Sequence, residues 1–427
     1  MAIYKLKDIA KVELSGVDKK TNSGEQSVRL CNFVDVYSNW AITHELYDGF
    51  MEATARPNEI LRFKLKKGQV AFTKDSETRD DIGIPAYIAE DFTDVILGYH
   101  NALVTPDESR LSGKYLNALM HTEYARKYWA NNASGSGQRY ALSVDAIESF
   151  PVPLPPLSEQ QRIGNIFSDL DKKICLNKLI NQNLEASLQL LFEYTFIQNA
   201  CSNWAYIPLG EYADIVNGAT PSTSNEDNYG GDIVWITPKD LSDQSCKFVF
   251  HGSRNITKQG YDSCSTTIVP KGTIVMSSRA PIGLLSIAKT SLCTNQGFKS
   301  LVPKDMKSSE YLYYYIKYHI PLIQQLGTGT TFKEVSRDDM SRFKIQCPDD
   351  STLSKWHNNV SSVFDKQFAT VKEIEELTKL RDELLPLLMN GQVTVTQLNS
   401  DFLSYLKIVP IYSGIVIPNN RSLGVQR

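Results

Sequence analysis

The side chains of this chain that are best suited to bind a ligand by hydrogen bonds or charge are polar and basic residues in predicted loops. In the major groove of DNA, Arg and Lys bind guanine edges, whereas Asn and Gln bind adenine edges. The candidate side chains are Lys74, Arg79, Tyr99, His100, Ser136, Gln138, Arg139 and Tyr140 in the first half, and Thr220, Ser222, Lys239, Ser278, Arg279, Gln296, Thr328, Thr330 and Lys333 in the second. We interpret them as candidates for DNA contact, with Arg279 and Lys239 the strongest.

The sequence carries no signature of catalysis. A methyltransferase that modifies a base amino group needs an Asn- or Asp-Pro-Pro-aromatic segment to hold the flipped base, and none is present. The G-x-x-x-x-G-K-[ST] loop that binds ATP phosphates is also missing. The six histidines have no metal-ligand spacing, and we interpret Asp232 and Asp240 as capping or surface groups. We therefore expect no catalytic site, metal site or cofactor in this chain.

Composition limits the class of protein. A chain of 427 residues is long enough for at least two domains with sizeable cores. Its seven cysteines form no C-x-x-C pair and no apolar run approaches the ~18 residues of a membrane span, which favours a cytoplasmic location. A net charge of -3 is unusual for a nucleic-acid-binding protein. Clustering of the basic residues on one face, or phosphate contacts supplied by a partner, would account for it.

The two halves of the chain resemble each other. KGQVAFTKDS from Lys67 matches KGTIVMSSRA from Lys271, and an Ile-Gly pair follows each segment. Further matches, in the same order, join YLNALM to YLYYYI, Gly135-Ser136-Gly137 to Gly327-Thr328-Gly329, and Asp145, Phe150 and Pro155 to Asp338, Phe343 and Pro348. The alternative is that two mixed domains share glycine and proline positions by chance, but five ordered blocks favour a duplication.

Each copy begins with short apolar runs and ends with a long helical pattern. Runs such as residues 232–238 and 267–276 are broken by Gly, Pro, Asn and Asp, which is typical of strands and turns. The first helical pattern follows Pro155-Pro156, and Ser158 with Gln161 has the spacing of a capping box that would start the helix. The second pattern stops near Asn390-Gly391, a common C-terminal signal.

Both helical patterns carry apolar stripes at heptad-like spacing, which indicates helices that seek helical partners. The stripes are Ile163, Ile166, Leu170, Ile180, Leu184 and Leu191 in the first helix, and Val360, Phe364, Phe368, Val371, Ile374, Leu377, Leu384 and Leu388 in the second. A second apolar set in the first helix, which we expect to be left over for a partner protein, is Phe167, Ile174, Leu188 and Phe192. The alternative is that both are ordinary amphipathic helices packed on their own domains, although about 40 residues at ~1.5 Å each exceed the width of a small domain.

The predicted fold class is α+β, with two globular domains in pseudo-twofold tandem repeat, separated by two long antiparallel coiled-coil-like helices. The expected boundaries are residues 1–155 and 201–349 for the domains, residues 156–200 and 350–395 for the helices, and residues 396–427 for a tail without a physical explanation.

Several segments of the chain match a known family. LPPLSEQQRIGNIFSDLDKKI from Leu154 and SLQLLFEYTF from Ser187 resemble the central conserved region of Type I restriction-modification specificity subunits. WITPKDL from Trp235, VNGATPS from Val216, TNQGF from Thr294 and LRDELLPLLMNGQV from Leu380 resemble further signatures of that family. The resemblance covers residues 1–395, more clearly in the second domain than in the first.

The resemblance implies a function for each part. Each globular domain would be a target-recognition domain that reads one half of a bipartite, asymmetric DNA site, and the helices would set the spacer. The partners would be double-stranded DNA, two methyltransferase subunits that bind S-adenosylmethionine, and optionally two restriction subunits that use ATP and Mg. Two other classes remain open: a single-chain methyltransferase or nuclease that carries its own specificity domains, and a structural coiled-coil adaptor.

Overall fold

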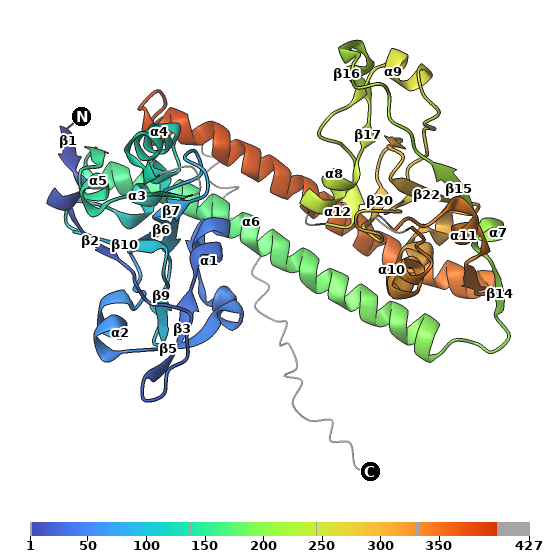
Figure 1. Ribbon diagram of the computed structural model, residues 1–427, viewed down its shortest axis with the longest axis horizontal. Coiled ribbons are helices and arrows are strands. Elements are labelled where there is room, and N and C mark those ends of the chain that lie inside the picture. Colours follow the sequence, from blue (N-terminus) through green and yellow to red (C-terminus); the bar gives the residue numbers. More distant parts are fainter. Residues whose placement is uncertain (1, 136–138, 245, 330–332, 399–427) are drawn as a thin grey trace. The chain divides into compact units, whose positions relative to one another are not determined.

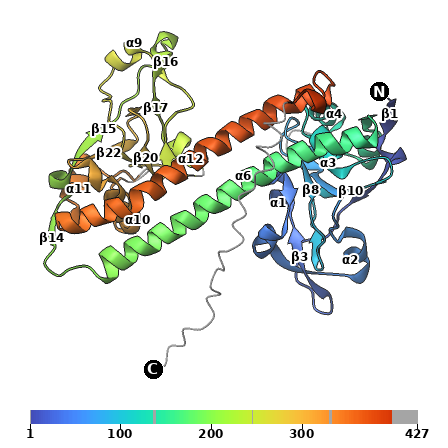
Figure 2. The same ribbon diagram turned by 180° about the vertical axis from the view of Figure 1, so that it is seen from behind.

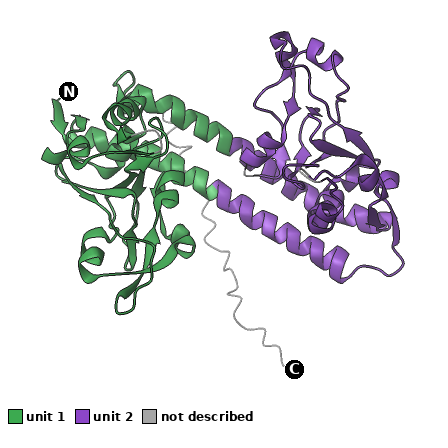
Figure 3. Ribbon diagram, viewed as in Figure 1, with its two compact units in different colours: residues 1–176, 374–427 green, residues 177–373 purple. Residues whose placement is uncertain are grey.

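The structure is a computed structural model and describes residues 2–135, 139–244, 246–329 and 333–398. Figure 3 shows its two compact units: unit 1 consists of residues 1–176 and 374–427, and unit 2 of residues 177–373. The predicted DNA contacts Ser136, Gln138 and Thr330 and nearly all of the predicted tail lie outside the described residues.

Unit 1 is built on a five-stranded sheet in the order β2-β10-β6-β8-β4. All neighbours are antiparallel except β4 and β8, which are parallel. The central strands β6 and β8 are buried along their whole length, which matches the continuous apolar runs of their sequences. The strand bounds are β2 Ala10–Leu14, β4 Ala41–Ile42, β6 Val70–Thr73, β8 Pro85–Ile88 and β10 Asn101–Pro106.

Unit 2 repeats this sheet. Its five strands lie in the order β15-β22-β19-β20-β18, and the one parallel pair among these described strands is again the last, β18 with β20. The strand bounds are β15 Ala213–Asn217, β18 Phe248–Val249, β19 Ile274–Ser277, β20 Leu285–Ala288 and β22 Phe298–Pro303. The matching topology confirms the predicted tandem repeat and the α+β class.

A pair of buried tyrosines marks the same position in both units. The hydroxyl of Tyr115 donates to the carbonyl of Pro153 over 2.8 Å, and that of Tyr311 donates to the carbonyl of Gln346 over 2.5 Å. Each acceptor lies in the second strand, along the chain, of a two-stranded antiparallel sheet, β13 of β1-β13 in unit 1 and β23 of β14-β23 in unit 2. The elements concerned are β1 Ala2–Lys5, β13 Pro151–Leu154, β14 Ala205–Pro208, β23 Lys344–Cys347, α3 Gly113–Met120 and α10 Ser309–Gln325.

The units differ in what is added to the common sheet. Unit 1 carries a second, three-stranded sheet in the order β5-β3-β9, and unit 2 carries the parallel pair β17-β21 instead. In unit 1 the remaining elements are α1 Phe33–Ser38, β3 Gln26–Cys31, β5 Met51–Ala55, α2 Pro57–Phe63, β7 Asp75–Ser76, β9 Val95–Leu97, α4 Glu123–Asn132, β11 Ser134–Gly135, β12 Tyr140–Ala141 and α5 Val144–Glu148. In unit 2 they are α7 Leu209–Tyr212, β16 Tyr229–Ile233, β17 Trp235–Ile236, α8 Pro238–Asp243, α9 Lys258–Asp262, β21 Cys293–Thr294 and α11 Arg337–Arg342.

Two long helices each run from one unit into the other, α6 (Leu157–Phe192) and α12 (Asp350–Met389) (Figure 1). The division therefore differs from the predicted one, in which the helices stood apart from the globular domains. In unit 1 the start of α6 shares a core with the end of α12, through Ile163, Ile166 and Leu170 and through Leu377, Leu384 and Leu388. In unit 2 the end of α6 shares a core with Val360, Phe364 and Val371 of α12, and Figure 2 shows α12 beside α10 there. The helices are therefore antiparallel within each unit, as predicted.

The expectation that a second apolar set of α6 is left for a partner protein is wrong. Phe167 and Ile174 lie in the core of unit 1, and Leu188 and Phe192 lie in the core of unit 2. The ring centroid of Phe167 lies 6.1 Å from that of Trp40, and the ring centroid of Phe192 lies 5.7 Å from that of Tyr314. The helices thus pack on their own globular domains as well as on each other. Contact of the remaining stripe residues, such as the half-buried Ile180, Leu184 and Phe368, with a partner stays a prediction.

The start of α6 also differs from the prediction. The helix begins at Leu157, so Ser158 is its second residue and does not act as the N-cap of a capping box. The polar contact here is made by Gln160, whose amide is buried against unit 1. Its oxygen accepts from the backbone nitrogen of Ser112, and its nitrogen donates to the carbonyls of Arg110 and Pro155, each over 2.9 Å.

We expect the Gln160→Leu variant to be about 1 to 3 kcal/mol less stable to unfolding, because the buried backbone groups of Ser112 and Arg110 lose their partner. Chemical denaturation of the two proteins measures this difference. The matched control is Gln161→Leu, which changes an exposed neighbour and is expected to shift stability by less than about 0.5 kcal/mol. Equal effects of the two variants would contradict the anchoring role of Gln160.

The end of α12 is as predicted. The helix stops at Met389, and Gly391 has a φ of 69°, a left-handed conformation that glycine adopts readily. The backbone nitrogen of Gly391 donates to the carbonyl of Leu388 over 3.2 Å, which satisfies one of the last carbonyls of the helix.

A partly buried charge network joins α6 to the globular part of unit 2. The carboxylate of Glu185 accepts hydrogen bonds from Lys247 and Lys317, each over 2.7 Å, and from the hydroxyl of Tyr314 over 2.9 Å. The ammonium of Lys247 lies 3.7 Å from the ring centroid of Phe364 on α12. Burial raises the pKa of Glu185, but the two lysines outweigh burial and bring the pKa to about 2. Glu185 is therefore ionised and fixes the rotation of α6 on unit 2.

Candidate DNA interface

In unit 1 the predicted contact residues gather at one corner of the sheet. The segment after β6, the residues before β10 and the β11–β12 hairpin meet there. The backbone nitrogen of Lys74 donates to the carbonyl of His100 over 3.0 Å, and that of Leu142 donates to the carbonyl of Lys74 over 2.8 Å. The short strand β7 pairs with β12, which completes the connection. We call this region corner 1, defined by residues 74–79, 98–100, 134–135 and 139–141.

The centre of corner 1 is a carboxylate that the sequence analysis did not select. Asp75 lies 2.7 Å from Nδ1 of His100 and 2.9 Å from a guanidinium nitrogen of Arg139, and the ammonium of Lys74 is 3.4 Å away. Burial raises the pKa of Asp75, but the hydrogen bonds from His100 and Arg139 hold it below its usual value. The carboxylate is therefore ionised and orients three cationic or polar side chains.

Aromatic rings line the rest of corner 1. Tyr99 packs against the ring of His100, and the ammonium of Lys74 lies 5.7 Å from the Tyr99 ring centroid. The guanidinium of Arg79 lies 5.0 Å from the ring centroid of Tyr140. Basic groups beside aromatic rings fit a surface that contacts nucleic acid.

Unit 2 has the same corner, built by the same backbone contacts. The backbone nitrogen of Ser278 donates to the carbonyl of Gly297 over 2.7 Å, and that of Val335 donates to the carbonyl of Ser278 over 3.0 Å. Arg279 forms an isolated β-bridge with Glu334. We call this region corner 2, defined by residues 278–280, 295–297, 328–329 and 333–334.

Three of the segments that carry the family resemblance converge on corner 2. The backbone nitrogen of Asn295, in TNQGF, donates to the carbonyl of Ile236, in WITPKDL, over 3.0 Å. Gly218, in VNGATPS, approaches so closely that a Cβ there would lie 2.3 Å from the carbonyl oxygen of Thr294. The hydroxyl of Thr220 donates to the side chain of Gln296. The three motifs therefore lie together at corner 2.

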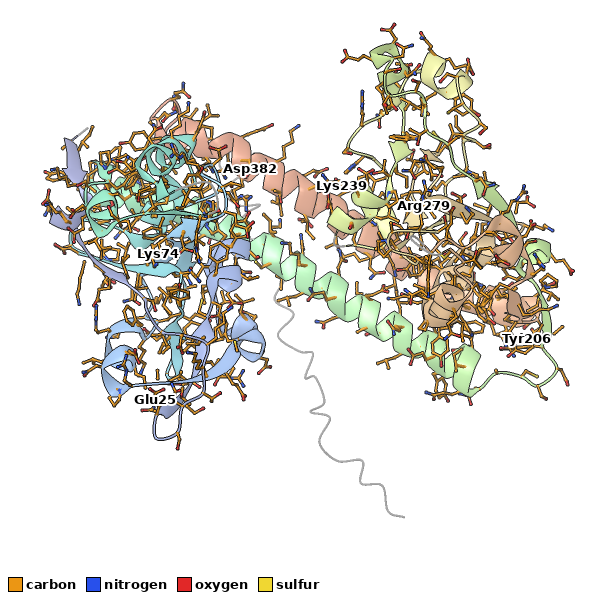
Figure 4. The ribbon with its side chains drawn as sticks, viewed as in Figure 1. Glu25, Lys74, Tyr206, Lys239, Arg279 and Asp382 are labelled. Carbon is orange, nitrogen blue, oxygen red and sulfur yellow. The ribbon has the colours of Figure 1, made fainter. Side chains whose placement is uncertain are left out.

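The charged centre of corner 2 is Glu334. Its carboxylate lies 3.2 Å from the ammonium of Lys299 and 3.5 Å from a guanidinium nitrogen of Arg279. Ser278 donates to the same carboxylate over 3.3 Å and is fully buried, so its hydroxyl supports the site and is not exposed for base contact. Figure 4 labels Lys74 of corner 1 and Arg279 of corner 2.

The other predicted residues of unit 2 lie around corner 2 or beside it. Thr328 pairs with Glu334 through two backbone hydrogen bonds, and Lys333 is exposed next to it. Lys239 is exposed on α8 (Figure 4), directly after Pro238, whose ring lies close to Gly297. Ser222 is exposed too, and its hydroxyl shares a hydrogen bond with Ser224.

The aspartates considered as metal ligands have simpler roles. Asp240 accepts hydrogen bonds from the backbone nitrogen and hydroxyl of Thr237 and from the backbone nitrogen of Ser253, and so caps α8. Asp232 is exposed on β16. Within the described ranges, no group of three or more His, Cys, Asp or Glu residues could hold a metal ion.

Comparison with known families decides the identity of the repeated unit. The family described as Type I restriction modification DNA specificity domain matches residues 1–186 and, a second time, residues 201–379. The chain belongs to this family. Two matches in tandem agree with the two sheets of identical topology.

Relatives within the specificity family match the chain over part or most of its length. The Type I restriction enzyme MjaIX specificity subunit of Methanocaldococcus jannaschii is 38% identical over 188 residues, which is 44% of this chain and 43% of that protein. The chain is thus aligned to less than half of that relative. The HindI specificity subunit of Haemophilus influenzae is 24% identical over 405 residues, covering 77% of this chain and 87% of that protein.

A solved specificity subunit has the same fold. The Type I restriction-modification S subunit from M. genitalium matches with a TM-score of 0.59 at 14% identity, over 91% of this chain and 95% of that one. At this identity the likeness concerns the fold alone. None of the helices in the described part of the chain is long and apolar enough to cross a membrane.

The acidic residue of each corner was not among the predicted DNA contacts. Those contacts include Lys74, His100, Arg139 and Arg279 but neither Asp75 nor Glu334, the carboxylates that hold them. One signal was present: Asp75 and Arg279 occupy the same position in the aligned segments KGQVAFTKDS and KGTIVMSSRA, so the repeat exchanges a charge there.

Proposed function

We propose that this chain is the DNA sequence-specificity subunit of a Type I restriction-modification complex. It reads a bipartite, asymmetric site, with corner 1 on one half-site and corner 2 on the other. The observation that carries the proposal is the duplication of one specificity fold, with basic and polar side chains gathered at the equivalent corner of each copy. Two different corners on one chain suit a site whose halves differ in sequence.

The long helices set the number of unread base pairs between the half-sites. Helices of 36 and 40 residues extend about 54 and 60 Å at ~1.5 Å per residue. Both helices are continuous across the boundary between the units, and each is packed into both cores. A continuous helix transmits length and rotation, and these two quantities define the spacing and phase of two half-sites on a duplex.

The chemistry is assigned to partner subunits. The sequence lacks the base-holding segment of a methyltransferase and the phosphate loop of an ATPase, so this chain itself would bind neither S-adenosylmethionine nor ATP with Mg. Two methyltransferase subunits would supply the methyl group, and restriction subunits, where present, would cut the DNA in the cytoplasm. The net charge of -3, which is unusual for a chain that binds DNA, is accounted for if the partners add many of the phosphate contacts.

The direct test is co-expression of the chain with its cognate methyltransferase subunit in a host without background methylation. Genome-wide methylation mapping is expected to show one bipartite motif that disappears when the chain is omitted. Methylation by the purified chain alone would instead support a single-chain methyltransferase. A complex without site-specific DNA binding would support a structural adaptor.

Lys239 is expected to contact phosphate, because it is an exposed, flexible cation on the helix beside corner 2. In the assembled complex, Lys239→Ala should weaken binding to all sequences by a similar factor and reduce the slope of log affinity against log salt by about 1. Fluorescence anisotropy at several salt concentrations measures both. A change confined to one base position would contradict the phosphate contact.

A further inference from the structure

Each corner contains an arginine–carboxylate pair, with the acidic residue at the end of the strand in corner 1 and in the hairpin in corner 2. In corner 1 the carboxylate Asp75 follows β6 and the guanidinium of Arg139 comes from the hairpin. In corner 2 the guanidinium of Arg279 follows β19 and the carboxylate Glu334 comes from the equivalent hairpin. Asp75 and Arg279 correspond in the backbone, because Asp75 pairs with Ala141 across the ladder as Arg279 pairs with Glu334, whereas Arg139 lies two residues before Ala141 in its hairpin. Both corners therefore place an arginine against a carboxylate, and the strand-end residue is acidic in one corner and basic in the other.

In each corner the arginine is more accessible than a structural ion pair requires. The side chain of Arg139 is 54% exposed, whereas that of Asp75 is 9% exposed. In corner 2 both partners are partly exposed, Arg279 by 36% and Glu334 by 37%, whereas Lys299, which also pairs with Glu334, is 8% exposed. The carboxylate contacts use one terminal nitrogen of each guanidinium, Nη2 of Arg139 and Nη1 of Arg279. In the described contacts the other nitrogens of each guanidinium carry no hydrogen bond, so they are free to bind a ligand.

We propose that Arg139 and Arg279 each read a guanine, one in each half-site, and that Asp75 and Glu334 are positioning residues that orient them. This inference rests on the proposed function and deepens it. Each half-site would therefore contain at least one G·C pair, with O6 and N7 of the guanine accepting two hydrogen bonds from the guanidinium.

The ion pair favours a base over a phosphate as the ligand. A phosphate contact draws its energy from net positive charge and tolerates many orientations. A neighbouring carboxylate cancels much of that charge, so it weakens a phosphate contact. The same carboxylate fixes the plane of the guanidinium, and a bidentate contact with a guanine edge depends on that plane. Each arginine is therefore arranged for selectivity at the expense of general affinity.

The backbone supports the same assignment. Among the described residues, the two non-glycine residues with positive φ are His100, at 75°, and Ala280, at 46°. His100 contacts Asp75 in corner 1, and Ala280 follows Arg279 in corner 2. Such conformations cost energy and persist where the surrounding structure holds them, which is common at binding sites. The two residues with positive φ therefore lie in the same corners as Arg139 and Arg279.

The test uses methylation maps of the complex of this chain with its methyltransferase partner. Arg139→Lys keeps the charge and removes the planar fork, so we expect discrimination at one guanine of the first half-site to fall about 5- to 150-fold, with the second half-site unchanged. Arg279→Lys should do the same in the second half-site alone. Asp75→Asn should relax the same position as Arg139→Lys, because Arg139 loses its orienting partner.

Arg62→Lys is the matched control, because Arg62 also pairs with a carboxylate in unit 1, 3.0 Å from Glu13, is 56% exposed and lies outside corner 1. It should leave the motif unchanged. Melting temperature and assembly with the partner, measured for every variant, separate loss of reading from loss of folding. Asp75→Asn and Arg139→Lys are independent routes to the same position, so one unstable variant leaves the other decisive.

Three results would overturn the inference. A wild-type motif in which either half-site lacks a G·C pair excludes the assignment at once. Uniform weakening at every position, with a lower salt slope, would make the arginines phosphate contacts. Relaxation of different positions by Asp75→Asn and Arg139→Lys would separate the two residues. A wild-type complex with no bipartite motif would instead refute the proposed function, so the two failures are distinguishable.

Discussion

Two helix-forming residues inserted after Leu176 in α6, together with two after Glu373 in α12, are expected to abolish site-specific methylation. Two residues rotate the rest of a helix by about 200°, so unit 2 would face away from the groove that it reads. Four residues inserted at both positions add ~6 Å and a net rotation of ~40°, close to the ~35° of one base pair of B-DNA. That variant should keep both half-sites and prefer a spacer longer by one or two base pairs.

The insertions are made in both helices because each helix passes through both units. An insertion in α6 alone would be opposed by α12 and would pull Glu185 away from Lys247. Methylation mapping reads the spacer directly, and circular dichroism of each complex checks that the helices form. An unchanged spacer in the four-residue variant would remove the role of the helices in spacing.

Replacement of Glu185 by Ala is expected to destabilise the protein by about 3 to 5 kcal/mol, because Lys247 would then be a buried charge without its carboxylate. Chemical denaturation followed by tryptophan fluorescence, with Trp356 in the core of unit 2, measures the change. The exposed neighbour Gln182, replaced by Ala, is the control and should change stability little. The double variant Glu185→Leu with Lys247→Met should recover most of the loss, since it removes both charges.

The same network predicts a loss of stability in acid. With a pKa near 2 in the folded protein and about 4.3 in an unfolded chain, Glu185 releases its proton more readily when folded. Its contribution is therefore complete above pH ~4.5 and is lost as the pH falls toward 2, a change of roughly 3 kcal/mol. Denaturation curves between pH 5 and 2.5, compared with those of Glu185→Ala, measure the contribution of Glu185 to the free energy of unfolding. Parallel pH profiles for the two proteins would contradict the assignment.

Much of this architecture was predictable because it is repeated or periodic. Lys67 and Lys271 begin matched segments whose glycines, Gly68 and Gly272, both have positive φ in the same turn. Heptad-like spacing identified the two long helices and their antiparallel packing. What periodicity could not decide is the surface on which a second apolar stripe packs. Phe167 and Phe192 were assigned to a partner, yet they face the chain's own domains, because a stripe has the same spacing whichever surface covers it.

The ion pairs were not predictable for a different reason. Asp75 and Arg139 are far apart in the sequence, as are Arg279 and Glu334, and they meet through the pairing of a hairpin with the end of a strand. A comparison of the two halves also hides them, since a position that is acidic in one half is basic in the other. The predicted loop contacts therefore include Arg139 and Arg279 but not the carboxylates Asp75 and Glu334.

Unit 1 consists of two segments that are far apart in the sequence, and this affects the order in which the two units fold during synthesis. The residues that close its core, Leu377, Leu384 and Leu388, leave the ribosome long after Ile163 and Ile166, which they cover. The domain that is synthesised first is thus the last to be completed, and unit 2 is finished before it. During translation the apolar side of α6 stays open to chaperones or to aggregation until the final turns of α12 arrive.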